Sequence, residues 1–128
     1  MQPLPAIPQA VILSPGDGRR LPLGAGCGEF ALVPSASGTL RADLPAPLEM
    51  RFRSGGESLR PVPARPRKRL KDLCQEAGVV PWMRGRLPLV YAGDRLVAVA
   101  DLWVEADFQA SAGVTGLTPV WHGRPELR

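Results

Sequence analysis

Proline and glycine interrupt this chain at short intervals, and their spacing limits the length of every helix and strand that it can form. There are 15 prolines and 14 glycines among 128 residues. Proline removes a backbone donor and glycine favours turns, so both tend to end regular elements. Hydrophobic residues still make up 45% of the chain, which is enough for one packed core. The sequence therefore predicts one domain of many turns and short strands.

Short apolar segments between these breaks predict strands. They are expected at 10–13, 29–35, the end of 44–53, both sides of the Gly-Asp turn within 87–108, and 115–123. At the end of 44–53, Met50 and Phe52 alternate with Arg51 and Arg53. Because neighbouring side chains of a strand point to opposite faces, this alternation predicts two guanidinium groups side by side on the solvent face.

One amphipathic helix is predicted after the prolines of residues 60–69. Leu70, Leu73, Cys74 and Ala77 follow the i, i+3, i+4, i+7 spacing of a single apolar helix face. Gly78 stands where a left-handed C-terminal cap is favoured. The expected fold class is therefore α+β, with about six to eight short strands and one clear helix.

Positive charge is concentrated in the middle of the chain. Residues 51–86 contain ten Lys and Arg and three acids, a charge of +7, whereas the net charge of the whole chain is +4. The remainder therefore carries −3. A basic stretch on a slightly acidic body is typical of contact with a polyanion, and a solvated charged loop is the alternative.

Composition also bears on where such a chain works. No apolar run approaches the roughly 20 residues of a membrane span, and the first residues lack the positive lead of a secretory signal. The two cysteines are far apart and form no C-x-x-C pair. These features predict a cytoplasmic protein without a disulfide scaffold or a zinc site.

A glycine-rich segment, Ser54-Gly55-Gly56-Glu57-Ser58, is similar to the pyrophosphate loop of ATP-dependent adenylating enzymes. Such a loop must open a helix so that backbone N–H groups point at phosphates. The prolines at 61 and 63 prevent a helix here, and Ser58 occupies the acidic position of the motif. The sequence therefore predicts a glycine turn after an edge strand.

Few residues suggest catalysis or metal binding. His122 is the only histidine and has no neighbouring cysteine cluster or paired acids. Cys74 lies on the apolar helix face and is expected in the core, while Cys27 in a glycine-rich link is expected to be exposed. No nucleophile with a base beside it is visible in the sequence.

Trp82 has two interpretations. It stacks on an unpaired nucleobase, or it folds over the core beside Pro81, and the core position is favoured. Arg84 and Arg86 are expected at the surface, where their alternative role is a salt bridge to Asp72, Glu76 or Asp94.

An ordered set of motifs resembles a known family. It consists of Arg51-Phe52-Arg53, Gly55-Gly56-Glu57, Leu70-Lys71, Gln75-Glu76, Gly78-Val79, Pro81-Trp82-x-Arg84, Pro88-Leu89 and the strand 96–99. It resembles the C-terminal domain of bacterial tRNA(Ile)-lysidine synthetase, closely over 45–105 and more loosely over 10–45 and 115–123. Val80 departs from the family, which often has a second proline there.

The resemblance implies a fold and a parent activity. The implied fold is a small β-sandwich-like core, similar to a domain of the phenylalanyl-tRNA synthetase β subunit. Members of the family use ATP, with Mg, to adenylate the cytidine at the first anticodon position of minor isoleucine tRNA, and lysine then displaces AMP. That chemistry belongs to an N-terminal catalytic domain, so no catalytic residue and no cofactor is carried over to this chain.

These considerations define the expected organisation and site. Residues 1–9 are expected to be a linker remnant and residues 10–128 a single tRNA-binding domain, excised from the parent ligase, that grips the tRNA near its acceptor stem. The expected partners are minor isoleucine tRNA and the missing catalytic domain. The expected RNA contacts are Arg51, Arg53, Arg65, Arg67, Lys68, Arg69, Lys71, Arg84 and Arg86.

Two other functions remain open from the sequence. A docking domain would pack its basic face on an acidic partner or on the catalytic module, and it would bind RNA weakly and without regard to RNA structure. A small stand-alone enzyme would need a cleft of titratable groups, which the sequence does not display.

Overall fold

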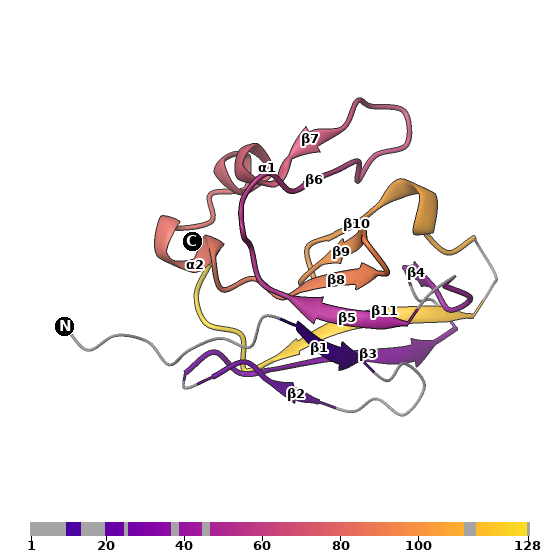
Figure 1. Cartoon of the computed structure of the whole chain (residues 1–128), viewed down its shortest axis with the longest axis horizontal. Helices are drawn as coiled ribbons and strands as arrows, with labels where there is room; N and C mark the ends of the chain where they lie inside the picture. Colours follow the sequence, from indigo (N-terminus) through magenta and orange to yellow (C-terminus); the bar gives the residue numbers. More distant parts are fainter. Residues whose placement is uncertain are drawn as a thin grey trace.

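Two antiparallel sheets make up most of the molecule (Figure 1). The computed structural model describes residues 10–13, 20–24, 26–36, 39–44, 47–111 and 115–127, and for 10–13 the backbone alone. The five-stranded sheet has the order β1 (Ala10–Leu13), β5 (Leu48–Arg51), β8 (Leu89–Ala92), β9 (Arg95–Val99) and β10 (Trp103–Val104). The four-stranded sheet has the order β2 (Leu21–Pro22), β3 (Glu29–Ser35), β11 (Gly116–His122) and β4 (Leu40–Arg41).

The remaining elements lie outside these sheets. They are a ribbon of β6 (Ser58–Leu59) and β7 (Lys68–Arg69), the helices α1 (Leu70–Glu76) and α2 (Pro81–Arg84), and the 3-10 helix η1 (Ala106–Phe108). The α+β class is confirmed, but the expected strand number is too low. The described chain has eleven strands, and five of them are two residues long. Two residues carry no periodic pattern, so the sequence could not reveal these strands.

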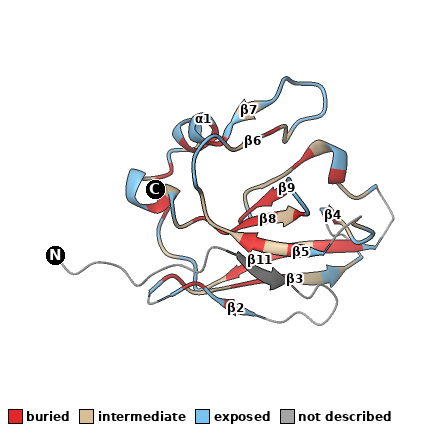
Figure 2. Ribbon diagram, viewed as in Figure 1, coloured by how far each residue is buried: buried red, intermediate tan, exposed pale blue. Residues whose placement is uncertain are grey.

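One hydrophobic core joins the two sheets and α1. It includes Phe30 of β3, Met50 of β5, Leu70 of α1, Val97 of β9 and Trp121 of β11. Figure 2 shows this burial along the strands, while the segments beyond them are largely exposed. Both cysteines are buried. This confirms the prediction for Cys74, whereas the prediction that Cys27 is exposed is wrong.

The longest pairing in the fold joins β3 and β11. It runs without a shift from Gly116 opposite Ser35 to His122 opposite Glu29. Pro119 lies inside β11, although proline cannot donate to a ladder. It is tolerated because β4 pairs only with the first two residues of β11, so among the described residues one side of the strand has no partner strand at Pro119.

A close backbone approach explains the glycine at position 28 and the burial of Cys27. Gly28 has a φ of +75° and packs so tightly on β11 that an added Cβ would overlap the backbone oxygen of His122. Beside it, the indole nitrogen of Trp121 donates a hydrogen bond of 2.7 Å to the backbone oxygen of Cys27. The glycine-rich link is thus fixed to the core, which buries the thiol.

The predicted helix is confirmed as α1. Leu70, Leu73 and Cys74 are its buried residues. Gly78 has a φ of +74°, and the following N–H of Val79 donates to the backbone oxygen of Cys74 at 2.9 Å. This is the left-handed termination that the glycine predicted.

Residues 81–84 form a second helix where the sequence indicated only a turn. Pro81 occupies the first turn of α2, a position where its missing N–H costs no hydrogen bond. A helix of four residues is too short to show an amphipathic period, which is why the pattern did not predict it.

Glu105 is a buried carboxylate that connects the β6–β7 ribbon to the five-stranded sheet. Its side chain is 1% exposed. One oxygen accepts hydrogen bonds from the backbone N–H groups of Arg60, at 3.1 Å, and Ala106, at 2.8 Å. The other lies 2.6 Å from a guanidinium nitrogen of Arg67, as an ion pair rather than an aligned hydrogen bond. The backbone N–H of Glu105 itself donates to Val97 in β9.

We expect Glu105→Ala to lower the free energy of unfolding by about 2–4 kcal/mol. The reason is that it leaves two backbone donors without their acceptor, each at a cost of about 1–3 kcal/mol. Urea unfolding measures the loss. Glu126→Ala, at an exposed carboxylate, is the control and should change stability by less than about 0.5 kcal/mol. Equal stabilities for the two variants would contradict this role.

Candidate nucleic-acid interface

The basic stretch forms one end of the molecule beside the sheets. The loop after β5, the β6–β7 ribbon, α1 and α2 follow one another there (Figure 1). We call residues 52–86 the basic end. Many residues of the basic end are exposed to solvent, as the pale-blue segments of Figure 2 show. Local backbone bonds hold it together, including one of 2.8 Å from the N–H of Leu70 to the oxygen of Glu57.

Three of the nine predicted RNA contacts already have acidic partners within the chain. These pairs are Arg51 with Glu49 at 2.7 Å, Lys68 with Glu76 at 2.7 Å, and Arg67 with Glu105 at 2.6 Å. The Arg51 guanidinium also lies over the ring of Tyr91, 4.4 Å from its centroid. β5 ends at Arg51, so the expected strand does not reach Arg53.

The other six predicted contacts have no acidic partner among the described residues. They are Arg53, Arg65, Arg69, Lys71, Arg84 and Arg86. The salt bridges considered for Arg84 and Arg86 are therefore not found within the described ranges. Arg84 instead donates through Nε to the backbone oxygen of Val79 at 2.9 Å. Its two terminal nitrogens remain available.

Two of these unpaired cations lie close to the buried side of α1. Burial raises the pKa of the Cys74 thiol, and the nearby charges of Arg84 and Arg53 lower it only in part. The thiol is thus kept in its neutral form at ordinary pH. Arg53 belongs to the loop after β5 and Arg84 to α2, so charges from two elements act on this thiol.

Trp82 is exposed, so the prediction that it belongs to the core is wrong. It is 74% exposed. In the single turn of α2, Met83 occupies the inward position and is 8% exposed. A helix this short has one position facing the core, and its neighbour in sequence must point elsewhere. Gly85 ends α2, and the N–H of Arg86 donates to the backbone oxygen of Met83 at 2.9 Å, so Arg86 lies in the turn directly after the helix.

The glycine turn at 54–57 holds an acid of this chain. One Glu57 carboxylate oxygen accepts from the N–H of Ser54 at 2.7 Å, and the other accepts from the N–H of Gly55 at 3.0 Å. Burial opposes ionisation of Glu57, but these backbone N–H groups and the Ser54 hydroxyl hold its pKa below the ordinary value. The glycine turn is confirmed, with Gly55 and Gly56 at positive φ, and its donors bind a carboxylate instead of a phosphate. The strand before it is not the edge strand that was predicted, because β5 lies between β1 and β8 in the five-stranded sheet.

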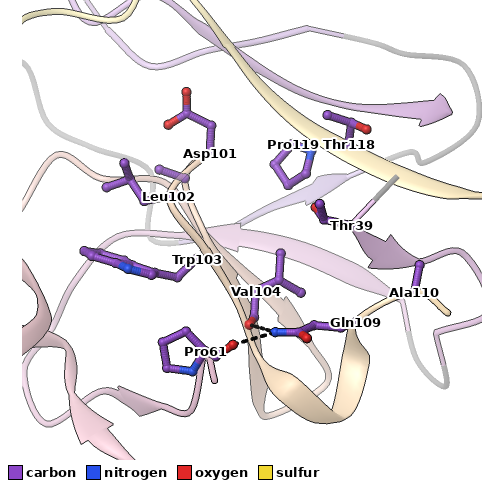
Figure 3. Close-up of a pocket in the computed structure, with 11 residues that line it drawn as sticks. Thr39, Pro61, Asp101, Leu102, Trp103, Val104, Gln109, Ala110, Thr118 and Pro119 are labelled. Atoms are coloured by element: carbon purple, nitrogen blue, oxygen red, sulfur yellow. Dashed lines mark hydrogen bonds between the residues drawn. The ribbon is translucent and has the colours of Figure 1, made fainter. Parts of the chain in front are cut away.

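A groove of about 540 Å³ lies between β10 and β11 (Figure 3). In it, the Gln109 amide donates to the backbone oxygens of Pro61 at 2.7 Å and Val104 at 3.0 Å. Its described lining contains a single titratable side chain, Asp101, which is paired with Arg124 at 2.9 Å. These groups suit packing and offer no donor–acceptor pair for proton transfer.

Two kinds of feature are absent from the described part of the chain. No group of three or more His, Cys, Asp or Glu side chains comes together there in an arrangement that could hold a metal ion. No helix there is long and apolar enough to span a membrane.

Comparison with known proteins identifies the family. The family model described as TilS substrate C-terminal domain matches residues 48–121, which is more than half of the chain. The chain belongs to this family. The matched range contains the whole basic end, so the paired and unpaired cations both lie in the family's own domain.

Several curated relatives support the same assignment. The tRNA(Ile)-lysidine synthase of Nitrosomonas europaea is 48% identical over 73 residues, 57% of this chain and 16% of the relative. That of Azoarcus sp. strain BH72 is 31% identical over 99 residues, 77% of this chain and 22% of the relative. The tRNA(Ile)-lysidine synthase of Vibrio cholerae is 37% identical over 91 residues, which is 70% of this chain and 21% of the relative. The chain thus spans about a fifth of the length of the relatives it matches.

Sequence reasoning missed the two acids that organise this TilS substrate C-terminal domain. Glu57 had a detectable signal, since a carboxylate two or three residues after backbone donors in a glycine turn can bind them. Glu105 had none, because an acid at the end of a strand usually faces solvent. Only its burial and its partners from the β6–β7 ribbon reveal its role.

We expect Glu57→Gln to make the free energy of unfolding of the domain less sensitive to acid. The pKa of Glu57 in the folded state lies below the ordinary value for Glu, which is about 4.3. Its ionised carboxylate therefore stabilises the folded domain at pH values above that ordinary value. This contribution is lost as the pH falls through the folded pKa. Urea midpoints between about pH 7 and pH 3 should therefore fall less steeply in Glu57→Gln than in the wild type. Glu126→Gln, at an exposed acid, is the control and should follow the wild-type curve.

Proposed function

We propose that this chain is the tRNA-binding domain of a tRNA(Ile)-lysidine synthase. The observation that carries the proposal is the set of six cations on the basic end that lack an acidic partner in the described structure. Family membership supports it, because the relatives are named for an isoleucine tRNA. The expected partner is minor isoleucine tRNA, gripped at its acceptor stem.

The proposal separates the nine predicted contacts into two groups. Arg53, Arg65, Arg69, Lys71, Arg84 and Arg86 would meet phosphates and 2′-hydroxyl groups of a stem. Arg51, Lys68 and Arg67 would instead position the surface through their acids. Forming an RNA contact with a paired cation first requires breaking its ion pair, and this reduces the gain.

The geometry of RNA supports recognition of shape and backbone. An A-form stem has a deep, narrow major groove and a shallow minor groove lined by 2′-hydroxyls. Long arginine and lysine side chains on exposed loops and short helices reach that surface without entering the major groove. The domain would therefore recognise the form of a stem more than its sequence.

The chemistry of the parent protein would lie outside this chain. We propose that a catalytic domain binds ATP with Mg and joins lysine to the cytidine at the first anticodon position, in the cytoplasm. The present domain would contribute the grip on the RNA. The proposed likeness of its fold to a domain of the phenylalanyl-tRNA synthetase β subunit would make this a shared way of holding tRNA.

Neutralising unpaired cations should weaken RNA binding more than neutralising paired ones. We expect Arg69→Gln, Lys71→Gln and Arg86→Gln together to reduce affinity for minor isoleucine tRNA by about tenfold or more. The dependence of log affinity on log salt should become shallower by about 2–3, because each lost phosphate contact removes about 0.7–0.9. Filter binding across a salt series measures both quantities.

The matched control removes the same charge from the rest of the molecule. Arg20→Gln, Arg41→Gln and Arg124→Gln neutralise arginines that are paired with acids, at distances of 3.9, 3.0 and 2.9 Å. Both triple variants lower the net charge of +4 by three. Equal effects of the two triples would show a general charge attraction and contradict a defined interface. Absence of binding by the wild type at low salt would favour docking on the catalytic module.

A further inference from the structure

The exposed indole of Trp82 is held on a rigid support. Met83 anchors α2 in the core, and the N–H of Val80 donates to the backbone oxygen of Leu127 at 2.7 Å. The Arg84 side chain adds a bond to Val79 at 2.9 Å. The backbone on both sides of the indole is thus fixed. A fixed aromatic side chain loses little conformational freedom when a ligand packs on it.

The exposure of Trp82 is unusual within the described chain. Trp121 is 6% exposed, with its indole nitrogen bonded to Cys27. Trp103 is partly buried against the core. The only other large hydrophobic side chain that is clearly exposed there is Val62, at 47%. An exposed tryptophan on a fixed turn keeps a large apolar surface in water, which favours a partner that covers it.

The charges around Trp82 indicate the chemistry of that partner. Arg84 belongs to the same short helix, and Arg86 lies in the turn that directly follows it. Neither has an acidic partner in the described ranges. An aromatic face next to arginines is suited to a ligand with both a flat ring and a phosphate, which describes a nucleotide.

We propose that Trp82 stacks on an unpaired nucleobase at the end of the bound RNA stem, while Arg86 contacts the adjoining phosphate. This inference rests on the proposed function. Bases inside a stem are stacked on their neighbours on both faces, so an indole reaches a free π-face only at a stem end or on an unpaired nucleotide. The acceptor stem of a tRNA continues into unpaired 3′ nucleotides, which supply such a base. The domain would thus bind the boundary between paired and unpaired RNA.

The test compares two RNA hairpins with the same stem. One ends bluntly and the other carries a short unpaired 3′ extension. The wild-type chain should bind the extended hairpin about 5- to 150-fold more tightly, which is the range for stacking one base on an aromatic side chain. Trp82→Ala should bind both hairpins with the affinity that the wild type shows for the blunt one. Trp82→Phe should keep much of the preference.

The controls separate stacking from other effects. Val62→Ala removes the other exposed hydrophobic side chain and should keep the full preference. Thermal unfolding of Trp82→Ala should match the wild type, because the indole is exposed. If the wild type binds both hairpins with equal affinity, the stacking proposal is wrong and the proposed function stands. The stacking proposal is also wrong if Trp82→Ala binds each hairpin with the wild-type affinity, because the indole would then serve a protein contact. Absence of binding to either hairpin overturns the proposed function itself.

Discussion

The buried carboxylate of Glu105 fixes the basic end to the sheets. It joins backbone donors of Arg60 and Ala106 and the guanidinium of Arg67, while its own N–H is bonded to Val97. A buried acid without partners would be strongly destabilising, so the ribbon segments that supply those partners must stay in place. The β6–β7 ribbon has only two paired residues in each strand and could not hold this position through its own hydrogen bonds.

Ion pairing divides one basic stretch into two sets of cations with different roles. Arg51, Lys68 and Arg67 bind acids of the chain, and the aromatic ring of Tyr91 also lies under Arg51. Arg60 is likewise paired, with Asp107 at 3.0 Å, whereas no acidic partner is found in the described structure for Arg53, Arg65, Arg69, Lys71, Arg84 and Arg86. The cations that are paired within the chain help to shape the surface. The unpaired cations give the surface a positive potential, which attracts a polyanion. Net charge alone does not distinguish these sets, because both contribute equally to it.

Sequence periodicity located the longer elements well and the short ones poorly. α1 with its left-handed termination at Gly78, the β8–β9 hairpin around Gly93, and β11 all correspond to patterns in the chain. α2 and the two-residue strands are shorter than one period of any pattern. Their positions follow from the partners that the folded chain brings beside them, which a local sequence window does not contain.

Sequence patterns were enough to predict the fold class, the main helix and hairpin, the family resemblance, and the concentration of positive charge between residues 51 and 86. These depend on local spacing and composition, which the chain carries in order. The folded structure was needed to show that Trp82 faces solvent, that Cys27 is buried and that Glu105 pairs with Arg67. Each of these depends on residues far apart in sequence meeting across the core. Residue type alone therefore does not decide whether such a residue is buried or paired; its contacts in the folded chain do.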